Sequence, residues 1–155
     1  MITIIALPEI ENEINENWQT LIYETIEATL CSTGEANEQP DVTVLLANDA
    51  YLQELNQQFM GLDQPTDVLS FPIGETNPEN GSFYLGDLAI SLERAKTQAE
   101  TGQNALEDEL RLLVVHGVLH LLGHDHSTAE EKAHMWSIQA EILKSMGSRL
   151  ILPIE

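Results

Sequence analysis

The sequence is poor in cysteine, in basic residues and in long apolar runs. Its single cysteine, Cys31, excludes a disulfide within the chain, and its place at the end of an apolar helical run predicts a buried apolar side chain rather than a nucleophile. No stretch of about eighteen apolar residues occurs, which excludes a typical transmembrane helix. The first residues lack the basic region and the small-residue cleavage site of a signal peptide. We therefore expect a soluble, cytoplasmic protein without a membrane partner.

Basic residues are scarce, at 6 lysines and arginines against 26 acidic residues and a formal charge of -20. A surface with this charge repels a polyphosphate, which argues against a nucleic-acid partner held by surface charge. A cleft that holds a divalent cation is an exception, because the ion makes it locally positive. The acidic coat itself is best interpreted as a solvated surface that aids solubility.

The chain has 155 residues, 43% of them hydrophobic, and this size fits one globular domain spanning residues 1–155. Apolar spacing predicts that strands and helices alternate in its first part. The predicted elements are a strand over residues 2–7, a helix over 14–30, a strand over 41–47 and a helix over 49–59.

Two strand-like runs follow, over residues 67–73 and 83–90, and Pro72 predicts that the first run ends there or lies at a sheet edge. Three helices complete the pattern. They are predicted to begin at Ser91, at the possible capping box of Asn104 with Glu107, and at the capping box of Ser127 with Glu130. We expect an α/β (α+β) fold with a small mixed sheet of about four strands and about five helices.

The segment LLVVHGVLHLL, residues 112–122, is apolar on every helical face except at His116 and His120. This pattern predicts a helix that is buried on all sides. Residues four apart lie on the same helical face, so both imidazoles can approach one metal ion at about 2 Å. The same spacing also occurs in core histidines with hydrogen-bond partners, and the pair alone leaves both interpretations open.

Gly123 and His126 favour the metal site. Glycine permits the left-handed backbone that ends a helix, so the chain can fold back and bring His126 to the same ion. The spacing H-x-x-x-H-x-x-G-x-x-H is that of the metzincin metalloproteases. His124 is a competing third ligand, but Gly123 argues against the continued helix that it requires. We predict a zinc site formed by His116, His120 and His126.

Three protein ligands leave the fourth tetrahedral position of zinc open, as is typical of catalytic sites. The expected catalytic group is a zinc-bound water, with Asp125 as a carboxylate that orients the imidazoles from behind. Metzincins carry a glutamate as general base after the first histidine, where this chain has Gly117, so proteolysis is disfavoured. Hydrolysis of a phosphodiester is still open. Imidazoles also accept nickel, copper or iron, so the spacing alone does not identify the metal.

The motif HGxLHLxGxDH, preceded by PTDVLSFP and LGDLAIS, resembles that of the YbeY family, and the resemblance covers nearly the whole chain. It implies an α/β fold with a small mixed sheet and a zinc-like ion held by His116, His120 and His126. It also implies a single-strand endoribonuclease that acts in rRNA maturation and ribosome quality control. The implied partners are rRNA precursors, the small ribosomal subunit and ribosome-associated proteins.

The chain departs from the family pattern in the segment NQQFMGLDQPTDVLSFP, residues 56–72. Met60 stands where the family usually has an arginine, and Leu62 stands where a basic residue is common. Methionine lacks the planar fork with which arginine binds phosphate. Arg94 and Arg111 are the remaining candidates for a substrate phosphate contact, with a solvated surface position as the alternative for each.

These features support two functional hypotheses. The first is a zinc-dependent, single-strand-specific endoribonuclease, which the open ligand position favours. The second is a ribosome-assembly or binding factor with a chiefly structural zinc, which the missing basic residues favour.

Overall fold

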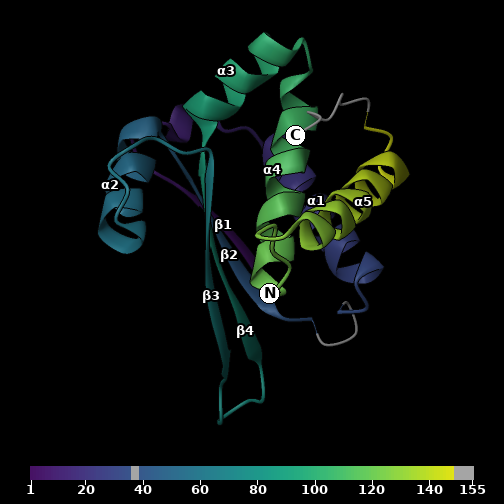
Figure 1. The fold of residues 1–155 in the computed structure, drawn as a ribbon. Helices are drawn as coiled ribbons and strands as arrows, with labels where there is room; N and C mark the ends of the chain where they lie inside the picture. The colour runs from purple at the N-terminus through teal and green to yellow at the C-terminus, as the bar shows by residue number, and fades with distance from the viewer. Residues whose placement is uncertain (36–38, 149–155) are drawn as a thin grey trace.

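The computed structural model describes residues 1–35 and 39–148, and these form four strands, five α-helices and one short 3-10 helix (Figure 1). In chain order the elements are β1 (Ile2–Ala6), η1 (Glu11–Glu13), α1 (Glu16–Ser32), β2 (Asp41–Ala47), α2 (Asp49–Met60), β3 (Val68–Thr76), β4 (Phe83–Ser91), α3 (Leu92–Gly102), α4 (Leu106–Leu121) and α5 (Ala129–Ser145). The predicted α/β fold is confirmed. Among the described helices, none has both the length and the apolar composition needed to cross a bilayer.

The four strands form one mixed sheet in the order β1-β2-β4-β3. β1 and β2 are parallel, as are β2 and β4, whereas β3 runs antiparallel to β4. β3 is therefore an edge strand, which accommodates Pro72 because a proline nitrogen cannot donate to a neighbouring strand. Of the two expectations for Pro72, the sheet edge is confirmed, since the strand continues beyond it to Thr76.

The main core lies between one face of the sheet and the helices α1 and α4. Alternate residues of the central strands point to this side, because side chains alternate across a strand. They are Val42, Val44 and Leu46 of β2 and Leu88 and Ile90 of β4. On the opposite face, Leu52 of α2 packs with Leu69 and Ala89. Figure 1 shows this arrangement, with α2 on one side of the sheet and α1, α4 and α5 on the other.

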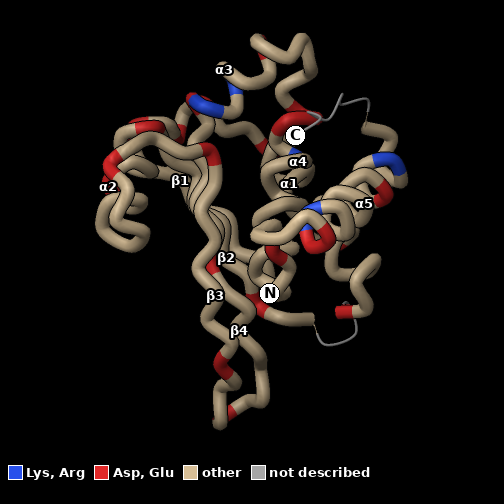
Figure 2. The backbone as a smooth tube through the Cα atoms, in the orientation of Figure 1, with Lys and Arg blue, Asp and Glu red and all other residues tan. Residues whose placement is uncertain are grey.

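α4 is the central helix, and its burial confirms the prediction from its composition. From Leu113 to Leu121 every residue except His116 and His120 is buried. α5 packs against it, with Met135 meeting Val115 and Leu119 in a second apolar cluster. Acidic residues are spread over helices, strands and loops with few basic residues among them (Figure 2), and Glu109 of α4 is buried.

Both capping boxes are misplaced in the sequence-based prediction. The backbone N–H of Asn104 donates to the Ala99 carbonyl at the end of α3. α4 begins after Ala105, which makes no side-chain cap. Ser127 instead donates its hydroxyl to Asp125, and Thr128 caps α5. In both cases the predicted cap takes part in the preceding turn.

Cys31 is exposed, which corrects the expectation of a buried thiol. α1 buries Ile22, Ile26 and Leu30 toward the core. One further residue rotates the helix by about 100°, and this rotation turns Cys31 away from the buried face.

Candidate metal centre

α4 presents His116 and His120 on one face, one turn apart and half-buried. Their Nε2 atoms lie 3.1 Å from each other. Two nitrogens bound to one zinc ion at about 2.05 Å and at the tetrahedral angle are about 3.3 Å apart. The two rings are therefore already arranged as ligands of a common ion.

Gly123 ends α4 and returns the chain toward these rings. Its φ is +95°, the left-handed conformation that glycine adopts without strain. The Gly123 amide donates to the His120 carbonyl at 3.0 Å, and the His124 amide donates to the Leu119 carbonyl at 3.0 Å. This pair of bonds is a Schellman motif, which caps the orphan carbonyls of the helix. The turn that the sequence predicted at Gly123 is confirmed.

His126 reaches the same point from the loop after this turn. Its ring centroid lies 5.1 Å from that of His120 and 5.7 Å from that of His116. One nitrogen from each of the three rings lies within 4.8 Å of the other two, so the three histidines could hold a metal ion. His124 lies outside this group and places its ring 5.8 Å from that of the exposed His134.

Asp125 organises the loop that carries His126. Its carboxylate accepts a bond from the Ser127 hydroxyl at 2.7 Å and one from the His126 amide at 2.7 Å. These bonds favour the charged form and lower the pKa of Asp125. In the structure they go to the loop and not to an imidazole, so an orienting role toward a ligand ring stays a prediction.

Gln139 of α5 is a site residue that the sequence-based reasoning missed. Its Oε1 lies 2.6 Å from Nδ1 of His116. An amide oxygen only accepts, so Nδ1 of His116 carries the proton and Nε2 keeps its lone pair toward the other two histidines. Gln139 is 2% exposed, between Met135 and Ile142 on the buried face of α5. The sequence signal that could have identified Gln139 is a polar residue at a core-facing position of the helix.

The surroundings of His116 and His120 favour uncharged rings. Burial lowers the pKa of His116, and burial together with the neighbouring His116 and His126 lowers the pKa of His120. Trp136 stands edge-on beside the cluster, with its ring centroid 5.7 Å from those of His116 and His126. A neutral imidazole is the form that binds a metal, so these histidines fit a transition-metal ion before any ion is bound.

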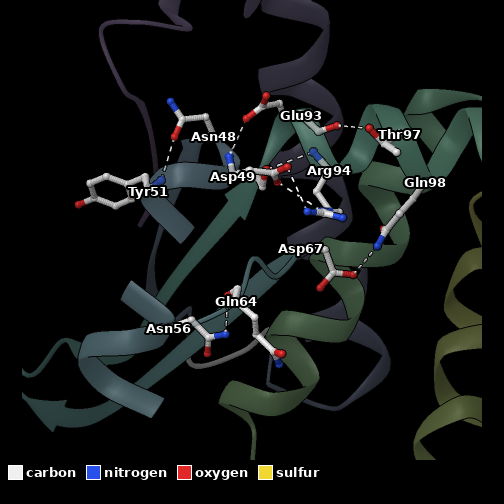
Figure 3. Close-up of polar contacts among 11 residues, drawn as sticks. Asn48, Asp49, Tyr51, Asn56, Gln64, Asp67, Glu93, Arg94, Thr97 and Gln98 are labelled. Carbon is white, nitrogen blue, oxygen red and sulfur yellow. Dashed lines mark hydrogen bonds and ion pairs between the residues drawn. The ribbon is translucent and has the colours of Figure 1, made fainter. Parts of the chain in front are cut away.

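The three histidines open into a groove of about 400 Å³ beside the edge strand β3. Its other lining residues are Met60, Thr66, Asp67, Val68, Leu69, Ser70 and Pro72. Asp67 accepts bonds from the Val68 amide and from Gln98 of α3, as Figure 3 shows for Gln98. Ser70 donates to the Gly117 carbonyl at 3.0 Å, which ties β3 to the histidine helix. Among the described residues, none that lines the groove is a lysine or arginine.

The structure places both predicted phosphate contacts away from this lining. Arg94 of α3 donates to the two carboxylate oxygens of Asp49, at 3.3 Å through Nε and at 3.1 Å through Nη2 (Figure 3). Arg111 donates to Asp108 at 2.9 Å and lines a different cavity, against Trp18 of α1. A phosphate contact by either arginine stays a prediction, and it requires the guanidinium to exchange its carboxylate for the phosphate.

Gly117 brings α4 close to the sheet. A Cβ atom at this position would lie 2.8 Å from Cδ2 of Leu88 and 3.3 Å from Cγ2 of Val68. The position therefore points into the core, where a side chain has no room. The structure explains in steric terms why the metzincin glutamate is missing here.

The bond from His116 to Gln139 predicts a clear effect of mutation on metal affinity. Gln139→Leu should weaken metal binding by about 10- to 100-fold, because His116 loses the partner that holds its tautomer and orientation. Gln139→Glu keeps an acceptor and should bind at least as tightly as the parent. Competition with a chromophoric chelator measures both affinities. Equal affinities for Gln139→Leu and the parent would show that the bond has no role in metal binding.

Comparison with known proteins identifies the family of this chain. A family model described as Endoribonuclease YbeY matches residues 5–147. The protein of that name from Heliobacterium modesticaldum is 36% identical over 87% of each chain, and the one from Persephonella marina is 44% identical over 70% of this chain and 71% of its own. The solution structure of TM1509 from Thermotoga maritima aligns with a TM-score of 0.55 at 28% identity, covering 95% of this chain and 92% of that one. The resemblance drawn from the motifs is thus confirmed, and the chain belongs to the YbeY family.

Proposed function

We propose that this chain is a zinc-dependent endoribonuclease that cleaves single-stranded RNA, with residues 1–155 acting as one hydrolase domain. The observation that carries the proposal is the convergence of three imidazole nitrogens within 4.8 Å at the wall of an open groove. The names of the relatives supply the substrate class, since they are called endoribonucleases.

His116, His120 and His126 are the proposed ligands, and zinc is the proposed metal because it favours three imidazoles with an open fourth position. A zinc ion held there supplies a Lewis acid that lowers the pKa of a coordinated water to about 7 and offsets the charge of a phosphate. Nickel, copper and iron also bind imidazoles, so metal analysis of the purified protein is the direct test of zinc.

The protein's own residues position the ligands and shape the groove. Gln139 holds the tautomer of His116, and the Schellman turn at Gly123 holds the loop of His126. Asp67 is the carboxylate that lines the groove, where it is a candidate acceptor for a proton released from the attacking hydroxyl. Whether that hydroxyl belongs to water or to the ribose is left open.

The proposed substrates are rRNA precursors of the small ribosomal subunit, and the proposed location is the cytoplasm. Ribosome-associated proteins are proposed as further partners. Arg94 and Arg111 are retained as proposed phosphate contacts. Both are paired with carboxylates in the free protein, so RNA would have to compete with Asp49 and Asp108 for them.

A second candidate function is a ribosome-assembly or binding factor in which zinc is chiefly structural. The observation that favours it is the absence of lysine and arginine from the groove lining, where Met60 occupies the place of the usual family arginine. Phosphate contacts normally supply most of the affinity for RNA.

Cleavage of labelled single-stranded rRNA fragments by the purified protein distinguishes these candidates. The endoribonuclease predicts endonucleolytic products that disappear on addition of a chelator and return with zinc. A His116→Ala protein should show the same loss without chelator. Cleavage that survives both treatments contradicts the proposal, whereas RNA binding without cleavage supports the assembly factor.

A further inference from the structure

A group of apolar side chains is exposed at the C-terminal end of α2 and on the edge strand β3, and one of them, Met60, lines the histidine groove. Phe59 and Met60 end α2 with 57% and 49% of their surface exposed, and Leu62 in the following turn is 50% exposed. Ile73 of β3 is 44% exposed, and Phe71 beside it is half-buried. We call these five residues the apolar shelf.

The shelf is continuous with the groove. The rings of Phe59 and Phe71 meet edge to face, with centroids 5.3 Å apart. Phe71 packs on the α2 side of the sheet, whereas Met60 and Pro72 line the groove together with the histidines. Met60 therefore belongs to both the shelf and the groove lining, and it joins the two across the edge strand β3.

These exposed side chains are not part of the apolar cluster that holds α2 against the sheet. The cluster under α2 is formed by Leu52, Leu69 and Ala89, with Leu55 and Phe71 packed against it. Phe59, Met60 and Leu62 lie outside that cluster. The C-terminal end of α2 also carries no charged residue, as the uncoloured tube in Figure 2 shows. Exposed apolar side chains beside a site can mark a binding surface.

The scarcity of free basic side chains indicates that the apolar shelf suits the bases of an RNA rather than its phosphates. Arg94, Lys96 and Arg111 are each paired with a carboxylate, and Lys132 lies over the Trp136 ring, 5.5 Å from its centroid. Since the described residues that line the groove include no lysine or arginine and the chain carries a formal charge of -20, uncharged contacts would add to the affinity that the proposed phosphate contacts supply. Aromatic and apolar side chains provide them by stacking on bases, whatever the base identity.

We propose that the apolar shelf, with Phe59 at its centre, binds an unpaired nucleobase of the RNA strand whose phosphodiester lies at the histidines. This inference rests on the proposed endoribonuclease function and adds a base-binding subsite to it. The subsite makes the site selective for single strands, because a base inside a duplex is already stacked and paired. Phe59 is a positioning residue here and takes no part in the bond cleavage.

The test compares the parent with Phe59→Ala, Phe59→Trp and the matched control Tyr23→Ala, which removes a ring that is 45% exposed on α1. The substrates are short single-stranded RNAs, one intact and the others each lacking a single base. Initial rates give kcat and KM, and fluorescence anisotropy in chelator gives binding without cleavage. Metal content and sedimentation of each variant are measured in parallel.

Phe59→Ala should raise KM for the intact RNA about 10-fold with kcat and metal content unchanged, the size expected for one lost base–aromatic contact. One abasic position should weaken the parent by a similar factor and have no further effect on Phe59→Ala. Phe59→Trp should restore KM, and Tyr23→Ala should match the parent.

Parent-like KM and binding for Phe59→Ala overturn the inference and leave the proposed function standing. So does an equal loss on intact and abasic RNAs, or a change confined to sedimentation, which would assign the shelf to a second copy of the chain. A parent that neither binds nor cleaves RNA overturns both proposals.

Discussion

His126→Ala is expected to abolish stoichiometric metal binding and to lower RNA cleavage by on the order of 100-fold or more. Loss of a residue behind a metal ligand already costs about 10- to 100-fold, so loss of a ligand itself should cost at least the upper end of that range. The two remaining rings, His116 and His120, keep 3.1 Å between their Nε2 atoms, but no other histidine of residues 1–35 and 39–148 belongs to their group. Elemental analysis and single-turnover cleavage measure the two effects.

His124→Ala is the matched control, because it removes an imidazole two residues away in the same loop. The ring of His124 lies beside His134 and outside the group of three histidines. This variant should keep one metal ion per chain and cleave RNA at the rate of the parent. The assignment of the third ligand is refuted if His124→Ala loses the metal while His126→Ala retains it.

Gly117→Glu is expected to lower the free energy of unfolding by about 4 kcal/mol or more. The new side chain starts 2.8 Å from Cδ2 of Leu88, between α4 and the sheet, and it brings an unpaired charge into a buried position. Although it recreates the glutamate position of the metzincins, the variant should gain no protease activity. Urea unfolding followed by circular dichroism measures the free energy of unfolding.

The control for this substitution is Ala140→Glu, which adds the same side chain and charge at an exposed position of α5. Its stability should stay within about 0.5 kcal/mol of that of the parent. Parent-like stability of Gly117→Glu would show that α4 can move away from the sheet, and the steric explanation for Gly117 would be wrong.

The local parts of the site could be predicted because they depend on neighbours in the chain. His116 and His120 share a face through the helical period, and Gly123 supplies the positive φ that a helix-ending turn needs. The capping boxes failed although they are also local motifs. α4 begins after Ala105 and α5 after Thr128, in each case one residue later than predicted, and Asn104 and Ser127 belong to the turns before these helices.

The partners of the site residues depend on packing between distant segments. Gln139 reaches His116 across 23 residues because α5 packs on α4. The sequence alone gives no partner for Arg94, which was therefore predicted to contact a phosphate. In the structure, Asp49 at the start of α2 lies beside α3 and pairs with Arg94. Ion pairs and hydrogen bonds of this kind follow from the order of the strands and helices, which apolar periodicity alone does not encode.

The sequence by itself therefore determined the histidine set, the turn that completes it and the α/β class of the fold. All three follow from backbone preferences and side-chain periodicity over short stretches. Only the tertiary structure decided what surrounds the metal centre. It placed β3 at the sheet edge, brought Met60 into the groove beside the histidines and left Phe59 exposed against Phe71. These contacts form only when distant apolar faces pack together and exclude water.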